Sequence, residues 1–527
     1  MSSEKPFTSH VEGYDNGKPS TQFEEYVKPK TSEADVGVDL GIEEINELEY
    51  YDLPPSLQHM TQEELRILDK KTTRRIDFRI LPILIVLYIL NYIDRTGIAT
   101  ARLGTLEEDL HMHGNQYQIA LSILFVGYIL FQVPSNMLMN KLGRPSTYLA
   151  VVMTIWGAIS TCTAAVQGFG GLAAVRVLLG VVESAFFPGA LMILSSWYDK
   201  KSLALRNSIL YSGSLISSAF GGLLSAAILE MDGLGGVAGW RYIFIIEGGL
   251  TVLVAPLAYF ILPDNPHNTK FLSQEEKDIV MWKLKKDLGN VDDSDAEAKE
   301  SDWQGFLHAC KDIKVWLLVA THSFLVAACG ITNFFPSVVQ TLNFTRTVTL
   351  CLTAPPYVIA VVATFLWSMH ADRSGERFWH ITIPLLLSLA AFIIGAALLN
   401  IGARYFSMCL MVPSLYCAFV VILTWVSNCC PRPPAKRAAA LALVNCLSNS
   451  TSIWNAYLYP ASDAPRYLVA FCCNCGFIVA SIAFAVGLRI RLMVLNKRIE
   501  RGTMDWQKEF GKGNDGTKIA SDFKFLY

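Results

Sequence analysis

The chain has 527 residues, of which 52% are hydrophobic and 17% are charged, and its formal net charge is -2. Ordinary soluble domains carry about 25% charged residues, so this composition argues against a soluble protein. The apolar residues are instead gathered into blocks of about twenty, each long enough to cross roughly 30 Å of hydrocarbon. The sequence therefore predicts a protein that crosses a bilayer many times.

The chain begins with a hydrophilic, acidic segment over residues 1–75, which we expect to be a cytoplasmic tail. The stretch from Met1 to Tyr51 contains no apolar core of the kind found in a signal peptide, so the first span is expected to direct insertion. Near the end of this tail, Thr61-Gln-Glu-Glu has the pattern of a helix N-cap.

Twelve apolar blocks follow, in two sets of six separated by a long charged loop. They predict an all-α membrane fold of twelve transmembrane helices in two pseudo-symmetric six-helix bundles. The first bundle is expected over residues 76–262, the central loop over 263–312, the second bundle over 313–492 and a tail over 493–527. The predicted spans lie near 78–99, 117–139, 147–166, 171–197, 207–229, 241–262, 314–335, 348–369, 379–400, 404–427, 437–459 and 467–490.

The basic residues are distributed unevenly between the predicted loops. One side carries clusters ahead of the first span and after the even-numbered spans, whereas the opposite loops carry mostly single arginines. Basic residues favour the cytoplasmic side, so both termini and the central loop are predicted to be cytoplasmic. Asn343-Phe-Thr345 is then a glycosylation sequon in an outward loop close to the membrane, and the sequence leaves its modification open.

An internal repeat supports the two-bundle arrangement. Asn140-Lys-Leu-Gly143-Arg-Pro follows the second span, and Asp372-Arg373-Ser-Gly375-Glu-Arg377 follows the eighth. Each is a tight basic turn in which glycine permits the reversal. We expect Asp372, Arg373, Gly375 and Arg377 to take part in conformational gating. Duplicated six-helix units place a binding site at mid-membrane between the halves.

Four ionisable residues stand inside predicted spans, where charge is costly and by default faces a cavity or a partner. Asp94 and Arg95 lie in the first span, and Arg176 and Glu183 lie in the fourth. The last two are nearly two helical turns apart, on one face and about 10 Å apart along the axis. One interpretation is a structural network that pairs Arg95 with Glu183, or Asp94 with Arg176.

The functional interpretation assigns different tasks to the arginines and the acids. A guanidinium grips a carboxylate at two points and stays charged when it is desolvated, so Arg95 and Arg176 are candidate substrate-binding residues. A buried acid can exchange a proton, so Asp94 and Glu183 are candidates for proton coupling. Both interpretations hold together if the empty protein pairs the groups that a substrate later separates.

Other polar residues inside spans are weaker candidates. Gln132, Asn333 and Asn445 are predicted substrate contacts. Glu247 fits a pathway residue and a structural hydrogen bond equally well, and His322 fits a buried structural histidine better than a proton site. The chain has no Gly-rich phosphate loop, so ATP is not expected to drive it. No metal or other cofactor is expected, and a proton gradient is expected to supply the driving force.

The Asp372–Arg377 turn, the twelve spans and the central loop together resemble the major facilitator superfamily over residues ~75–495. More specific motifs are Asn91-Tyr-Ile-Asp94-Arg95, Arg176-Val-Leu-Leu-Gly-Val-Val-Glu183-Ser-Ala-Phe-Phe-Pro188-Gly, Trp197-Tyr, Trp240-Arg-Tyr-Ile-Phe-Ile-Ile-Glu247-Gly and Asp463-Ala-Pro-Arg-Tyr467. These motifs resemble the anion:cation symporter family of that superfamily, and in particular its fungal allantoate permease-like group.

The resemblance implies a proton-coupled transporter that imports a small organic anion, such as a vitamin, a ureide or another carboxylate. It implies that Asp94, Arg95, Arg176 and Glu183 carry proton coupling and anion recognition. We expect a monomeric plasma-membrane protein whose partners are the anion, protons and lipid, with no nucleic acid and no enzymatic activity. An exporter or organelle carrier of a secondary metabolite and a non-transporting nutrient sensor remain alternatives, and the substrate stays open.

Overall fold

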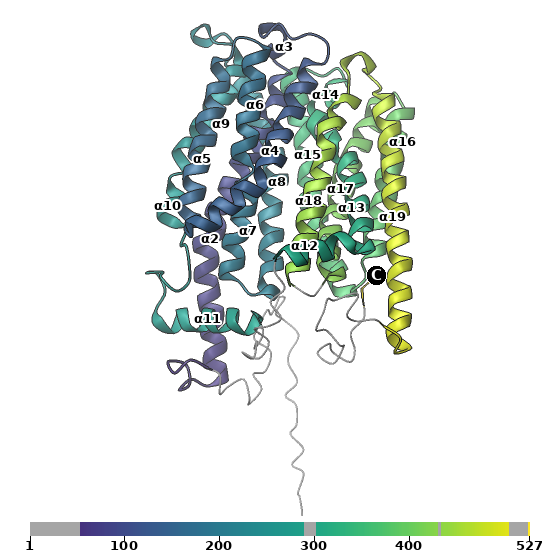
Figure 1. The fold of residues 1–527 in the computed structure, drawn as a ribbon. Coiled ribbons are helices and arrows are strands. Elements are labelled where there is room, and N and C mark those ends of the chain that lie inside the picture. The colour runs from purple at the N-terminus through teal and green to yellow at the C-terminus, as the bar shows by residue number, and fades with distance from the viewer. Residues whose placement is uncertain (1–52, 289–301, 431–433, 505–524, 527) are drawn as a thin grey trace, which may run out of the picture. The chain divides into compact units, whose positions relative to one another are not determined.

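The computed structural model describes residues 53–288, 302–430, 434–504 and 525–526. Residue contacts divide the chain into Met1–Gly41 and Ile42–Tyr527, and every described residue belongs to the second unit. The predicted tails and central loop therefore fall partly outside the described residues. Within the second unit, the described secondary structure is helical throughout and forms two bundles (Figure 1).

The first bundle consists of α2 (Gln62–Ala101), α4 (Gln116–Leu142), α5 (Pro145–Cys162), α6 (Phe169–Glu183), α7 (Phe186–Trp197), α8 (Lys200–Leu229), α9 (Gly239–Val254) and α10 (Leu257–Ile261). The second bundle consists of α13 (Ile313–Cys329), α14 (Phe335–Gln340), α15 (Arg346–Ser374), α16 (Phe378–Ala397), α17 (Ile401–Cys429), α18 (Pro434–Asn455) and α19 (Leu468–Glu500). The helices α3 (Leu106–Asp109), α11 (Gln274–Leu288) and α12 (Asp302–Lys311) lie between spans, as do the 3-10 helices η1 (Thr163–Ala165), η2 (Leu234–Gly236), η5 (Ala456–Leu458) and η6 (Ala461–Asp463). The 3-10 helix η4 (Gly330–Phe334) joins α13 to α14.

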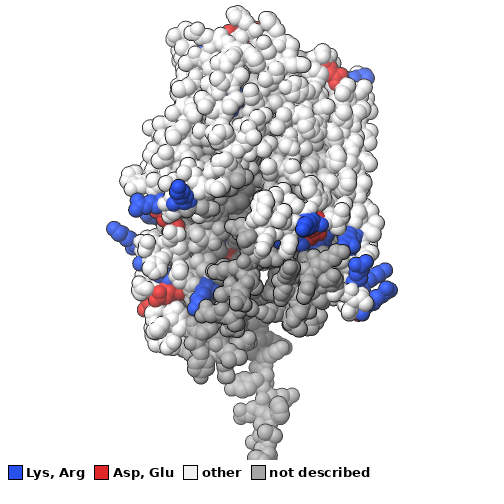
Figure 2. Space-filling view, in the orientation of Figure 1, with Lys and Arg blue, Asp and Glu red and all other residues white. Residues whose placement is uncertain are grey.

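The predicted membrane fold is confirmed. Within the described residues, 10 helical segments are long and apolar enough to cross a membrane. The two remaining predicted spans are also helical: α4 contains an apolar stretch over Gln116–Gln132, and α18 covers the eleventh span. Figure 2 shows a broad face almost free of charge, with the Lys and Arg side chains gathered mainly toward the lower end.

The first span differs from its expected start near residue 78. Thr61 caps α2 with the expected capping box, because its hydroxyl accepts from the backbone N of Glu64 while the Glu64 carboxylate accepts from the backbone N of Thr61. The helix then continues without a break for 40 residues. Its polar first half packs against α11, through ion pairs between Arg75 and Glu276 at 2.8 Å and between Lys283 and Asp69 at 2.9 Å.

Two pairs of helices make the largest contacts between the two bundles. The helix α8 packs on α15, and α4 packs on α18. At the end of α8, Thr347 Oγ1 donates to Glu230 Oε1 at 2.6 Å, and Arg346 donates to the backbone oxygen of Leu229 at 3.4 Å. We call this end the far end; the opposite end, where α2 begins and α19 finishes, is the terminal end (Figure 1). The bundles are thus joined at the far end.

The repeated turns have the same backbone conformation. The helix α4 ends at Gly143 with φ 62°, and α15 ends at Gly375 with φ 65°. Each glycine N–H donates at 3.2 Å to a carbonyl four residues earlier, on Met139 and Ala371 respectively. Left-handed φ values at a helix end favour glycine, because a Cβ is strained there. The predicted role of glycine in both reversals is confirmed.

Candidate functional site

A buried ion pair joins the first and fourth predicted spans. The Arg95 guanidinium on α2 lies 3.3 Å from the Glu183 carboxylate, and their side chains are 17% and 3% exposed. This is one of the two pairings that the sequence suggested. The Arg95 charge also lies 4.7 Å from the ring centroid of Phe125, 5.6 Å from that of Tyr92 and 5.8 Å from that of Tyr128. Aromatic faces stabilise a desolvated cation at such distances.

A break in the fourth span places Glu183 at a helix end. The span divides into α6, which ends at Glu183, and α7, which begins at Phe186. Pro188 explains the break, since a proline lacks the N–H that would bond to Ser184 and its ring clashes with that carbonyl. The break leaves the Glu183 side chain beside α2, where it pairs with Arg95.

Asp94 is held on the other side of α2. It is 2% exposed, and its two carboxylate oxygens accept hydrogen bonds from Ser160 Oγ at 3.1 Å and Thr251 Oγ1 at 3.3 Å. These donors come from α5 and α9. The neighbours Asp94 and Arg95 therefore have different partners, and Asp94 is held by hydroxyl groups rather than paired with Arg176 as the second suggested pairing required.

Arg176 is buried in α6 and, among the described residues, forms no ion pair with either of these carboxylates. Its Nε donates to the backbone oxygen of Ala120 at 3.4 Å, and its Nη1 has no hydrogen-bond partner within the part of the chain that the structure describes. Glu247 on α9 is also buried, and neither of its carboxylate oxygens has a hydrogen-bond partner among the described residues. It lies close to α2, since a Cβ on Gly97 would stand 2.8 Å from Glu247 Oε2.

A cavity of about 370 Å³ lies between the bundles. Arg95 lines it from the first bundle, and Asn333 and Asn445 line it from the second. The described lining does not include Gln132, Arg176, Asp94 or Glu183. Glu183 is connected to the cavity by its ion pair with Arg95, which is a lining residue. The predicted substrate contacts stay predictions for all five residues, namely Arg95, Gln132, Arg176, Asn333 and Asn445.

The cavity extends from mid-membrane toward the terminal end. Its lining includes Ile209, near the start of α8, and Ser368, near the finish of α15. Both helix ends lie at the terminal end of the bundles. At the far end, by contrast, α8 and α15 approach so closely that a Cβ on Gly222 would overlap the Thr353 hydroxyl. The cavity is therefore closed at the far end.

The sequence model of the Major Facilitator Superfamily matches residues 84–454, and this range includes Arg95, Glu183 and both repeated turns. The chain is a member of the Major Facilitator Superfamily. A putative tartrate transporter of Agrobacterium vitis is 31% identical over 72% of this chain and 83% of its own length. A high-affinity nicotinic acid transporter of Saccharomyces cerevisiae is 28% identical over 87% of this chain and 85% of its own.

A solved bacterial structure has a similar fold. The bacterial homologue of the human lysosomal transporter Spinster, in an inward-facing and occupied conformation, superposes with a TM-score of 0.61 at 16% identity. The match covers 80% of this chain and 98% of that one. At this level of identity the comparison establishes the fold alone.

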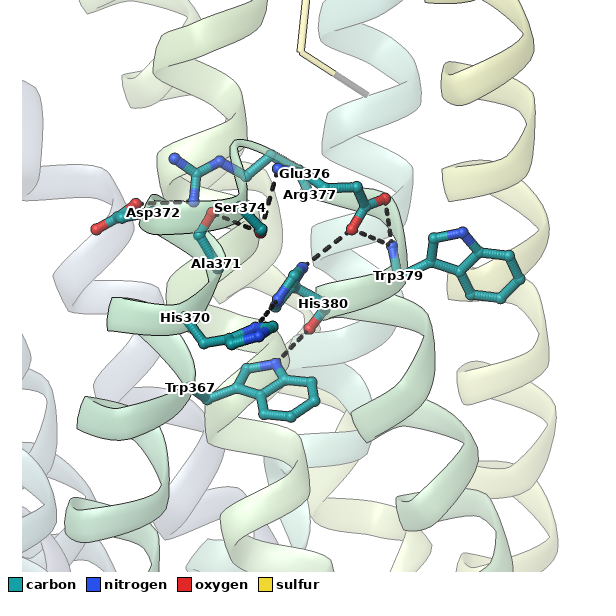
Figure 3. A network of polar contacts seen from close by, with 9 residues as sticks. All are labelled: Trp367, His370, Ala371, Asp372, Ser374, Glu376, Arg377, Trp379 and His380. Atoms are coloured by element: carbon teal, nitrogen blue, oxygen red, sulfur yellow. Dashed lines mark hydrogen bonds and ion pairs between the residues drawn. The ribbon is translucent and has the colours of Figure 1, made fainter.

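The predicted gating turn forms a polar network at the terminal end (Figure 3). Arg377 is paired with Asp372 at 2.8 Å, and Glu376 accepts hydrogen bonds from the backbone N of Trp379. A chain of close contacts continues from Glu376 to His380 at 3.0 Å and from His380 to His370 at 2.7 Å. These contacts tie α15 to α16. The gating role itself stays a prediction, and no partner of the Arg373 side chain is shown in this network.

Several residues of the site were missed from the sequence. Ser160 and Thr251, which hold Asp94, gave no signal because hydroxyl groups inside helices commonly bond to their own backbone. The aromatic part of the cavity lining was also missed, since apolar rings at helical spacing indicate a packed core equally well. Among these aromatic residues, Tyr92 was the one that the sequence could have indicated, because it lies two positions before Asp94, the first of the two intramembrane charges in that span.

Proposed function

We propose that this facilitator is a proton-coupled secondary transporter that imports a small organic anion by alternating access. The observation that carries the proposal is the position of Arg95, which lines the cavity while sharing its charge with the buried carboxylate of Glu183. A guanidinium at the wall of a membrane cavity is suited to a carboxylate substrate, because it remains charged there and offers two parallel donors.

The ion pair gives a physical route to coupling. A substrate carboxylate and Glu183 compete for the same guanidinium, and a carboxylate left without a partner in a low-dielectric interior is strongly disfavoured. Substrate binding therefore favours the protonated form of Glu183, and protonation of Glu183 favours substrate binding. The two events are linked reciprocally, as thermodynamics requires of any two coupled sites.

Asp94 is proposed as a second proton-exchanging group. It lies next to Arg95 in the chain, yet Ser160 and Thr251 hold it toward α5 and α9. A protonated Asp94 can donate to one of these hydroxyl groups, whereas the ionised form can only accept from them. Movement of α5 or α9 relative to α2 would change these bonds, and this would connect the proton state to the arrangement of the first bundle.

The relatives support the substrate class. Tartrate and nicotinic acid, named for two of them, are both carboxylic acids. We propose a cytoplasmic terminal end, because exposed basic residues gather there on α2, namely Lys70, Lys71, Arg74 and Arg79. The cavity would then face the cytoplasm in this conformation. A monomer in the plasma membrane is part of the same proposal.

The test is uptake of labelled organic carboxylates into proteoliposomes or cells at about pH 5.5 and about pH 7.5 outside. Acid-stimulated accumulation is expected for the wild type and not for Glu183→Gln or Arg95→Ala. The exposed α2 residues Glu63 and Arg66 supply matched controls, Glu63→Gln and Arg66→Ala, which should behave as the wild type. Efflux driven by the opposite gradient would favour an exporter, and correctly delivered protein with no transport would overturn the proposal.

A further inference from the structure

The charge of the cavity lining restricts the substrate further. Among the described residues that line the cavity, Arg95 is the only Lys, Arg, Asp or Glu. One guanidinium can neutralise one carboxylate, and a second carboxylate on the same ligand would be buried without a cation. Arg176 does not supply the missing charge, because it is not part of the lining and it bonds to the backbone of Ala120 instead. The cavity therefore suits a monoanion.

Aromatic rings line the cavity from both bundles. The first bundle contributes three and the second contributes four: Tyr92, Phe125, Tyr211, Tyr357, Phe365, Tyr416 and Phe419. Phe419 lies at the centre of this group, with ring centroids 6.1 Å from Tyr211 of the other bundle, 6.2 Å from Tyr416 and 4.9 Å from His322. These separations match the range of ~4.5–7 Å that aromatic pairs prefer.

The rings are arranged to receive a planar group next to the charge. The Arg95 guanidinium already lies over Phe125 at 4.7 Å and near Tyr92 at 5.6 Å, and both of these rings line the cavity. A carboxylate bonded to Arg95 would project the rest of its molecule from these rings toward the second bundle, where Tyr416 and Phe419 stand. A flat ring can contact aromatic faces or edges there, whereas a puckered ring fits the same space less closely.

The size of the cavity agrees with a single ring. Its volume of about 370 Å³ is near the lower limit of the range of ~300–1,000 Å³ that is usual for small-molecule sites. Polar groups at the second bundle, among them Asn333 and Asn445, leave room for a hydrogen-bonding substituent. From the single cation and the rings of both bundles, we infer that the transported anion is a compact aromatic monocarboxylate. This inference rests on the proposed function and names its substrate class.

The test compares three anions for binding to the purified full-length protein in detergent. Benzoate and cyclohexanecarboxylate share one carboxylate and a six-membered ring and differ in planarity, and tartrate carries two carboxylates without a ring. Benzoate is expected to bind at least about tenfold more tightly than either of the others. Phe419→Leu is expected to remove most of the difference between benzoate and cyclohexanecarboxylate, and Phe220→Leu, on a side chain that is 60% exposed, is expected to preserve it.

Each other outcome overturns the inference in a distinct way. Equal binding of benzoate and cyclohexanecarboxylate, or a difference that survives Phe419→Leu, would overturn the aromatic class. Tighter binding of tartrate would overturn the monoanion, and no binding of any of the three would overturn both. None of these results decides the proposed function, because acid-stimulated uptake of any organic anion in the panel described above would still establish it.

Discussion

The guanidinium of Arg95 lies 3.3 Å from the carboxylate of Glu183, and only the arginine of this pair lines the cavity between the bundles. Under the proposed function, the acid would not contact the transported anion directly but would respond to it through their shared partner, Arg95. Such an arrangement keeps the charge of the empty site neutral while the protein changes conformation. It also gives a direct physical reason for a proton to accompany an anion.

Replacing Arg95 with lysine distinguishes the effect of the positive charge from that of the planar guanidinium. Arg95→Lys keeps a positive charge near Glu183 but offers no planar pair of donors, so two-point contact with a carboxylate is lost. We expect the KM for the anion to rise by roughly tenfold or more, with the acid stimulation of uptake retained. Concentration-dependent uptake at two pH values measures both quantities. An unchanged KM would contradict a direct contact between Arg95 and the substrate.

Glu183 is paired with Arg95, whereas the buried carboxylate of Glu247 has no hydrogen-bond partner among the described residues. An unpaired charge there would be very costly, so we expect the neutral acid in this conformation. Glu247→Gln should then change the free energy of unfolding by about 0.5 kcal/mol or less. Thermal melts in detergent test this. A loss of several degrees in the melting temperature would instead indicate an ionised Glu247 with a partner.

Close packing of α4 on α6 depends on Gly180. A Cβ at this position would overlap the carbonyl oxygen of Leu124, a backbone atom that cannot rotate away. Gly180→Ala should therefore destabilise the protein by about 1–3 kcal/mol, despite the better helix propensity of alanine.

The matched control is Gly476→Ala in α19, where an added Cβ would meet no other part of the described chain within 4 Å beyond its own helix backbone. This substitution should leave the melting temperature unchanged or raise it slightly, by up to about 1 kcal/mol in free energy. Chemical or thermal unfolding in one detergent compares the two variants. Equal effects in both would show that the contact between α4 and α6 does not limit stability.

Asp312, which precedes the membrane segment of α13, predicts a pH dependence of stability. Its carboxylate lies 2.7 Å from Lys436 Nζ and 3.5 Å from Lys314 Nζ. Burial raises the pKa of Asp312, but the two ammonium groups outweigh this effect and hold the pKa below its usual value. The stabilisation is therefore present above the unfolded-state pKa of about 3.9 and is lost as the pH falls through the lower folded-state pKa.

Asp312→Asn should accordingly cost about 3 kcal/mol at neutral pH, because two buried ammonium groups lose their carboxylate. The difference from the wild type should shrink as the pH falls below about 3.9. Thermal melts over this pH range measure it, with Asp372→Asn as the control, since Asp372 is 66% exposed and exposed pairs contribute little. A cost that is independent of pH would contradict the ion-pair explanation.

The sequence predicted the fold and located the intramembrane charges, but it did not reveal the aromatic residues that line the cavity. Long apolar blocks and an unequal charge distribution are imposed by the bilayer, so the bundles could be predicted without homologues. Arg95 and Glu183 could be found for the same reason, because an intramembrane charge needs a partner. The aromatic residues that line the cavity around Phe419 could not be found in this way. A ring that faces a cavity and a ring that faces another helix follow the same helical period in the sequence.

Two further features required the three-dimensional structure. The helix start after Thr61 was predicted, but its unbroken continuation into the first span was not, because the first half of α2 is polar and is stabilised by α11, which is distant in the sequence. The separation of Asp94 from Arg95 was also hidden, since adjacent helical residues point about 100° apart and their partners come from different helices. Sequence spacing located the charges but could not assign their contacts.

The most direct test of coupling measures protons released or taken up when an anion binds. Purified protein in weakly buffered solution near neutral pH, with a pH indicator, would receive an anion that the uptake panel shows to be transported. The competition between substrate and Glu183 for Arg95 predicts net proton uptake on binding, and predicts that Glu183→Gln binds the anion with this uptake lost or much reduced. Anion binding without any proton uptake by the wild type would contradict the account.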